Sequence, residues 1–162
     1  MFMRIKKHIV LSVLFFGAAI MTLAVFLLHP TFFIGRKKIG NVVSFPGKDV
    51  RVSIELARDP YAWGKGLMFR NELASDAGML FVFPKEGRQS FWMKDTLIPL
   101  DMLFISKDNR IVTIHKNAAP CTALICPHYT ATKNSLYVLE VNAGFVDQHD
   151  IREGDAIEID IE

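Results

Sequence analysis

The stretch from Ser90 to Ile105, SFWMKDTLIPLDMLFI, constrains the fold of this chain more than any other segment. Its second part, from Leu97 to Ile105, is apolar except for Asp101, and such near-continuous apolar runs are typical of strands that are buried on both faces. An ionisable group in a buried strand is costly unless it has a partner. The stretch therefore predicts a buried strand in which Asp101 has a definite partner.

Segments in which apolar and polar residues alternate flank this stretch on both sides. Residues 50–56 and 157–162 alternate in this way, which is typical of half-buried strands. The other expected strands are residues 79–83, 89–93, 100–105, 110–115 and 136–141, with a turn at residues 84–87 and a hairpin between the third and fourth of them. Asp59-Pro60 suits the start of a short helix, and Asn142 suits the N-cap of another. The pattern predicts a mainly β fold over residues 49–162, a compact β sandwich or squat barrel with two short helices.

The N-terminal part of the chain has the composition of a membrane anchor. Residues 1–8 form a basic head, and residues 9–28 are an uncharged run of 20 residues, roughly 30 Å long as a helix and so long enough to cross the hydrocarbon core. A cleaved signal peptide usually has a shorter apolar region and a small-residue cleavage site, which residues 25–28 do not offer. We therefore expect one transmembrane helix that acts as an uncleaved signal-anchor, followed by a linker at residues 29–48.

The distribution of charge predicts the orientation of this anchor and excludes one class of partner. Three Lys/Arg precede the apolar run and three follow it, but the leading cluster lies closer and gains the α-amine, which favours the N-terminus inside and the domain outside the cytoplasm. Residues 41–162 contain 13 Lys/Arg and 17 Asp/Glu, a net charge of −4. Without a basic face, we expect no binding to nucleic acid.

Four charged residues lie next to large apolar side chains and form the first candidate site: Arg70, Lys94, Asp95 and Asp101. In a structural interpretation, Asp101 accepts hydrogen bonds from the backbone or from Arg70 and fixes the strand. In a functional interpretation, the four residues and Trp92 bind a ligand in a pocket. Catalysis around Asp101, Lys94 and Arg70 is the further alternative, and it would need a raised pKa of Asp101 and a nearby acid.

Aromatic and methionine side chains are abundant in the same region. In a structural interpretation these side chains form the hydrophobic core, because aromatic residues dominate small cores and methionine fills irregular gaps. Alternatively, an exposed tryptophan could stack on a sugar ring or a peptide, and thioethers could hold Cu(I). The residues are Trp63, Met68, Phe69, Met79, Phe81, Phe83, Phe91, Trp92, Met93 and Met102.

The two cysteines, Cys121 and Cys126, are flanked by prolines and are five positions apart. Outside the cytoplasm a lone pair of cysteines is more often bridged, so we expect a disulfide that closes a small loop. His115 and His128 complete a set of four N/S ligands, which leaves a metal site as a weak alternative, although the spacing matches no usual zinc pattern. Free thiols are the third possibility.

Several segments resemble the domain-of-unknown-function 192 (DUF192) family. They are GLMFR (66–70), GMLFVFP (78–84), SFWMKDTLIPLDMLFI (90–105), the Pro120-Cys121 loop with Cys126-Pro127, YVLEV (137–141) and the later Gly154-Asp155. The usual Asn of the family is Asp95 here. The resemblance implies a compact, mostly β domain, often behind an export signal, and no established activity.

These observations predict a function of binding rather than of catalysis. The chain has no G-x-S-x-G, H-E-x-x-H, P-loop or Rossmann glycine motif, so we expect no cofactor and no familiar reaction. The prediction is a membrane-anchored, extracytoplasmic module of the cell envelope that binds a small ligand or an envelope protein. An enzyme of unknown reaction, centred on Asp101, Lys94 and Arg70, is the alternative.

Overall fold

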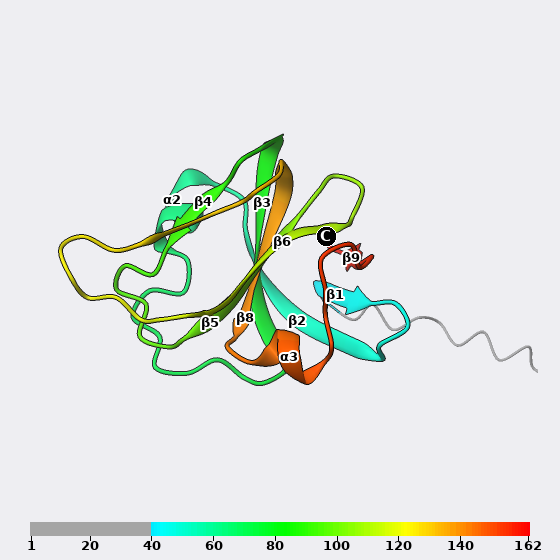
Figure 1. The fold of residues 1–162 in the computed structure, drawn as a ribbon, viewed down its shortest axis with the longest axis horizontal. Helices are drawn as coiled ribbons and strands as arrows, with labels where there is room; N and C mark the ends of the chain where they lie inside the picture. Colours follow the sequence, from blue (N-terminus) through cyan, green and yellow to red (C-terminus); the bar gives the residue numbers. More distant parts are fainter. Residues whose placement is uncertain (1–39) are drawn as a thin grey trace, which may run out of the picture. The chain divides into compact units, whose positions relative to one another are not determined.

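The computed structural model describes residues 40–162, which form a mainly β unit with a curled, half-barrel sheet (Figure 1). Seven strands form this sheet in the order β6-β5-β8-β3-β2-β1-β9, and β4 and β7 form a separate two-stranded ribbon. The elements are β1 (Val42–Phe45), β2 (Val50–Ala57), α2 (Pro60–Lys65), β3 (Ala77–Gly87), β4 (Ser90–Trp92), β5 (Leu100–Ile105), β6 (Ile111–Ala118), β7 (His128–Thr130), β8 (Ser135–Asn142), α3 (Phe145–Gln148) and β9 (Glu158–Asp160). The mainly β prediction with two short helices is confirmed, and the sheet is a half barrel.

Strand β5 is an interior strand of the sheet, next to the edge strand β6, and it is buried as its apolar sequence predicts. All six of its residues are buried, and it pairs with β6 on one side and β8 on the other. Because side chains alternate along a strand, Leu103 joins one apolar cluster and Phe104 joins a second. The sheet therefore has a core on each face, and α3 contributes Phe145 and Val146 to the first.

The first helix begins where the sequence predicts. The Asp59 Oδ1 accepts a hydrogen bond from the backbone N–H of Ala62 at 2.9 Å, and Pro60 occupies the first turn. The helix ends at Gly66, whose φ of +45° lies in the region that glycine adopts most readily. The second helix starts later than predicted, after Gly144, because the Asn142 side chain donates instead to the carbonyl oxygens of Leu73 and Ala74.

Three strand boundaries also differ from the sequence prediction. Strand β3 continues through the predicted turn at residues 84–87, and its register with β8 shifts between Val82 and Gly87, where a proline without an N–H can be accommodated. Strand β7 lies in a segment for which the sequence predicted no strand. Strand β1 lies within the predicted linker of residues 29–48 and pairs with both β2 and β9.

The predicted transmembrane segment, residues 9–28, lies outside the described residues, as does the basic head at residues 1–8. Within residues 40–162, none of the helices has the length and apolar composition needed to cross a membrane.

Candidate functional site

A narrow cavity opens between α2 and the ribbon strand β4, on the second core face of the sheet. Its volume is about 30 Å³, enough for one or two water molecules. The wall is formed by Trp63, residues 64–68, Phe81, Phe91, Trp92 and Thr96, and Glu140 lies at its base.

Glu140 is positioned by the middle of β8. In the register of the sheet it lies directly opposite Met79 on β3 and Met102 on β5, so an apolar side chain flanks it on either side. The residue is only 4% exposed, and within residues 40–162 it forms no hydrogen bond or ion pair. None of the described side chains has a fully buried oxygen or nitrogen without a partner, so the carboxyl oxygens of Glu140 keep access to the cavity.

Burial raises the pKa of Glu140 from its usual value of 4.5 to about 8. The cause is desolvation, which disfavours the charged form, and no neighbouring cation counteracts it among the described residues. At neutral pH the group is therefore mainly a protonated acid, which can donate one hydrogen bond into the cavity. A cationic ligand would instead favour the carboxylate.

The aromatic wall is held in place by its own contacts. The Trp63 indole donates a hydrogen bond to the Ala57 carbonyl at 3.0 Å and packs on Phe83 with ring centroids 5.0 Å apart. Phe91 meets Phe81 edge to face at 4.8 Å. Trp92 lies closer to solvent, at 47% exposure, with His128 beside it at 6.0 Å. The cavity therefore has fixed inner walls and an exposed indole among its lining residues.

Asp101 lies on the opposite face of the sheet from Glu140. It pairs in register with Val141, the residue after Glu140, and its side chain is fully buried. Its two oxygens accept hydrogen bonds from the backbone N–H groups of Asn117 at 2.8 Å and Val146 at 2.9 Å. The backbone alternative of the structural interpretation is thus the one observed. Asp101 joins the end of β6 to the first turn of α3.

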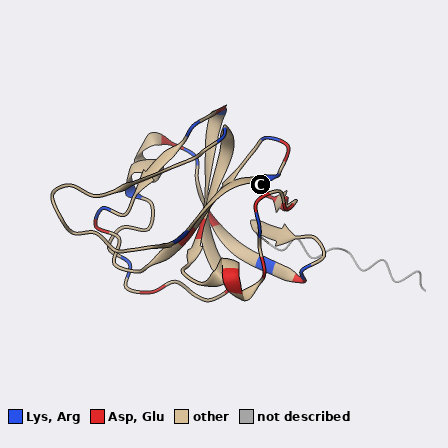
Figure 2. Cartoon of the chain, viewed as in Figure 1, with Lys and Arg blue, Asp and Glu red and all other residues tan. Residues whose placement is uncertain are grey.

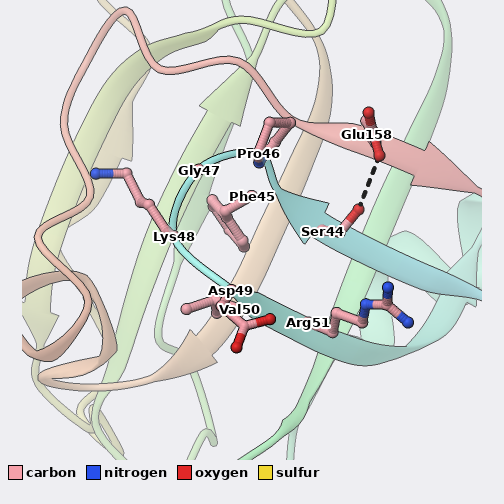
Figure 3. A pocket seen from close by; sticks show the side chains of 9 residues that line it. All are labelled: Ser44, Phe45, Pro46, Gly47, Lys48, Asp49, Val50, Arg51 and Glu158. Atoms are coloured by element: carbon pink, nitrogen blue, oxygen red, sulfur yellow. Dashed lines mark hydrogen bonds between the residues drawn. The ribbon is translucent and has the colours of Figure 1, made fainter.

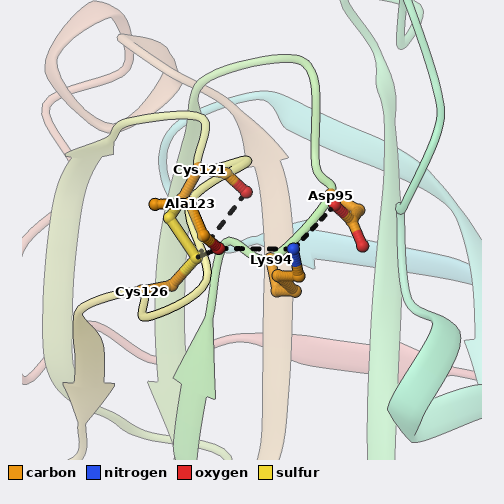
Figure 4. The surroundings of a disulfide bond; sticks show 5 residues. All are labelled: Lys94, Asp95, Cys121, Ala123 and Cys126. Atoms are coloured by element: carbon orange, nitrogen blue, oxygen red, sulfur yellow. Dashed lines mark hydrogen bonds and ion pairs between the residues drawn. A yellow bond between two sulfur atoms is a disulfide. The ribbon is translucent and has the colours of Figure 1, made fainter.

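The other predicted residues are spread over three places. Arg70 forms a two-bond ion pair with Glu55, with one of its bonds at 2.7 Å. Lys94 lies 3.2 Å from Asp95 and donates to the Ala123 carbonyl at 3.3 Å, beside the loop that holds the cysteines (Figure 4). Of the five candidate binding residues, Trp92 alone lines the described cavity.

Cys121 and Cys126 form a disulfide, which confirms the sequence prediction (Figure 4). The metal alternative is wrong, because bridged sulfurs are not available as thiolate ligands. The two histidines of that alternative have other neighbours: the His115 Nε2 lies 3.0 Å from the Thr130 carbonyl oxygen, and His128 contacts Ser90 and Trp92.

A larger hollow of about 630 Å³ lies along the turn between β1 and β2 (Figure 3). The Ser44 hydroxyl donates to Glu158 at 3.3 Å, and Lys48 forms an ion pair with Asp155 at 3.2 Å. Asp49 and Arg51 on its edge are exposed to water. The hollow thus offers a ligand no buried polar group that lacks a partner, and Glu140 makes the narrow cavity the stronger candidate.

Comparison with protein families matches residues 42–159 to DUF192, described as "Uncharacterized ACR". The chain belongs to the DUF192 family. No curated protein shows significant similarity to it.

Two crystal structures are similar to this DUF192 domain. One is a Sinorhizobium meliloti 1021 protein with the provisional description of a transcription regulator; it is 40% identical, with a TM-score of 0.66, over 74% of this chain and 90% of that one. The other is a protein of unknown function from Novosphingobium aromaticivorans DSM 12444, 36% identical, with a TM-score of 0.67, over 72% of this chain and 83% of that one.

The segments through which the sequence resembles DUF192 proteins converge on the narrow cavity. GLMFR provides residues 66–68 of the wall, and SFWMKDT provides Phe91, Trp92 and Thr96. YVLEV provides Glu140. Glu140 was missed in the sequence because YVLEV was interpreted only as a strand. Glu140 has the same sequence signal that identified Asp101, a charged residue inside an apolar strand.

Proposed function

We propose that this DUF192 domain binds a small ligand in the cavity above Glu140, as a module of the cell envelope held at the membrane by residues 9–28. The observation that carries the proposal is a largely buried carboxyl group that lines an aromatic cavity and has no protein partner among the described residues. Since none of the described side chains has a fully buried oxygen or nitrogen without a partner, the Glu140 oxygens reach the cavity and are available to a ligand. Binding sites combine apolar walls with a few polar groups in this way.

Catalysis is less well supported than binding. A carboxyl with a pKa near neutrality suits a general acid or base, but a reaction usually needs a second positioned group. Among the described residues that line the cavity, the other ionisable side chain is Lys65, which is exposed. Asp101 lies on the other face of the sheet, and Arg70 and Lys94 are engaged in ion pairs.

Nucleic-acid binding, which the description of the Sinorhizobium meliloti protein raises, is not favoured for this chain. Residues 41–162 carry a net charge of −4. In the part that the structure describes, Lys and Arg positions are interspersed with Asp and Glu positions along the ribbon (Figure 2). Phosphate contacts require a basic surface.

A location outside the cytoplasm is supported by the disulfide, because such bonds persist in oxidising compartments. A reporter enzyme fused after Glu162 should be active outside the cytoplasm only, and the protein should remain with the membrane fraction after a high-salt wash. The matched control is a variant that begins at residue 40, whose reporter should stay in the cytoplasm. Cytoplasmic activity of the full chain would contradict the orientation, and its release into the soluble fraction would contradict the anchor.

Ligand binding can be tested by the thermal unfolding of the full chain with millimolar members of five classes: primary amines, alcohols, amides, carboxylates and sugars. At least one class should raise the melting temperature, since a ligand at 100 times its Kd stabilises the folded state by about 2.7 kcal/mol. Trp92→Ala should lower the affinity for that ligand about tenfold, because it removes part of the cavity wall. Tyr61→Ala removes an exposed ring outside the cavity lining and should leave this affinity unchanged.

Failure of all five classes to stabilise the protein would contradict the binding of a small ligand. The exposed apolar side chains of Phe69, Leu124 and Ile125 would then favour an envelope protein as the partner.

A further inference from the structure

The acidic group in the cavity lining restricts the class of ligand. Glu140 is the acidic group of the lining, and within residues 40–162 no cation pairs with it. The walls present aromatic rings, whose faces attract cations and repel anions. Lys65, the cation of the lining, is exposed to water, whereas at Glu140 a cation would find an acceptor together with aromatic side chains.

The size of the cavity distinguishes between kinds of cation. A space of about 30 Å³ holds one or two water molecules, and an –NH₃⁺ group is close to water in size. A quaternary ammonium carries three additional methyl groups on its nitrogen and exceeds this space. A primary ammonium also has N–H donors for the Glu140 oxygens, which a quaternary nitrogen lacks.

We infer that the cavity takes the ammonium group of a primary alkylamine, with the nitrogen on Glu140 and the alkyl chain leaving the cavity past the exposed ring of Trp92. This inference rests on the proposed function, because it names the ligand class of the same cavity. The ion pair supplies the partner that Glu140 lacks, and the cavity itself holds only the ammonium group.

Binding is coupled to the release of a proton. A cation beside Glu140 favours its carboxylate form, so an acid that is mainly protonated at pH 7 loses its proton when the amine binds. Lys65 at the end of α2 is the other ionisable group of the lining, and His128 on β7 packs against Trp92. On the sheet itself, Glu55 on β2 and His115 on β6 lie in the same row as Glu140. Glu55 and His115 are each separated from Glu140 by one strand of the sheet, on opposite sides of it. Glu55 is already paired with Arg70.

The test is isothermal titration calorimetry of the full chain in detergent, with n-butylamine as the probe. At pH 7 butylamine should bind at least tenfold more tightly than n-butanol, butyrate or butyltrimethylammonium. Titrations in phosphate and in Tris, which differ in ionisation enthalpy, should report the release of close to one proton for each amine bound. Nα-acetyl-lysine-N-methylamide distinguishes the sources: stronger binding than butylamine assigns the site to a lysine side chain, and weaker binding assigns it to free alkylamines.

Two variants complete the test. Glu140→Gln keeps the shape of the side chain and removes its charge, so the affinity for butylamine should fall at least tenfold and the proton release should disappear. Asp95→Asn removes a carboxylate outside the cavity and should change neither quantity. Urea unfolding of both variants checks that they are folded.

Equal binding of butylamine and butanol would overturn the inference, as would an unchanged affinity of Glu140→Gln or binding without proton release. If another of the five ligand classes binds while amines do not, the alkylamine assignment is wrong and the proposed binding function stands. If none binds, both are wrong.

Discussion

Replacing Asp101 with leucine should lower the free energy of unfolding by about 3–5 kcal/mol, since it leaves one buried and one partly buried backbone N–H group without acceptors, at roughly 1–3 kcal/mol each. The donors are those of Asn117 and Val146, and both bonds are shorter than 3 Å. Asp101→Asn keeps one oxygen acceptor but turns an amide N–H₂ group toward the other donor, so the loss should be about 1–3 kcal/mol. Urea unfolding of the two variants measures both values.

The partner of Asp101 can be identified by a double substitution. Because Arg70 pairs with Glu55 and not with Asp101, Arg70→Leu should recover none of the stability lost in Asp101→Leu, and the two effects should add within about 0.5 kcal/mol. Asp150→Asn is the matched control: its ion pair with Arg152 is exposed and should contribute less than about 1 kcal/mol. An Asp101→Leu variant within about 0.5 kcal/mol of wild type would show that Asp101 is not a buried acceptor.

Asp101 illustrates what the sequence of this domain could and could not predict. An apolar run with one carboxylate indicated a buried strand and a buried acceptor, and both are observed. The donors could not be predicted, because they are backbone groups 16 and 45 residues further along the chain. Backbone N–H groups occur at every non-proline residue, so the sequence carries no signal for the ones that the fold brings to Asp101.

The order of the strands in the sheet could not be predicted from the sequence for a related reason. Alternation reports which face of a strand is buried, but it does not report the neighbour of that strand. Strand β8 inserts between β5 and β3, and β2 pairs parallel to β3 across α2. These long-range pairings place Glu140 between Met79 and Met102. The cavity combines residues of α2, β3, β4 and β8, which are distant in sequence. The sequence could therefore indicate Trp92, which lies beside the charged candidates Lys94 and Asp95, but not the rest of the site.

Glu140→Gln should make the protein more stable at neutral and higher pH. The folded-state pKa of Glu140 is about 8 and the usual value is 4.5, so between these values the folded protein holds a proton that the unfolded chain has lost. The contribution of this group to wild-type stability therefore falls as pH rises from about 4.5 to about 8 and is constant above that. Since one pKa unit corresponds to about 1.4 kcal/mol, the full loss is at most roughly 5 kcal/mol.

Glutamine has no proton to lose in this range, so the advantage of Glu140→Gln over wild type should grow from near zero at pH 4.5 to several kcal/mol at pH 8. Urea unfolding at pH 5, 6, 7 and 8 measures it. Glu55→Gln is a control whose effect on stability should have the opposite pH dependence. The hydrogen bonds from Arg70 lower the pKa of Glu55. The pair therefore stabilises the fold above pH 4.5, and this stabilisation is lost as the pH falls. Its effect should stay below about 1 kcal/mol, since the pair is partly exposed. Parallel pH profiles for wild type and Glu140→Gln would show that Glu140 ionises as freely in the folded protein as in the unfolded chain. The carboxyl would then be solvated or already paired, and the cavity would have lost the feature that makes it a binding site.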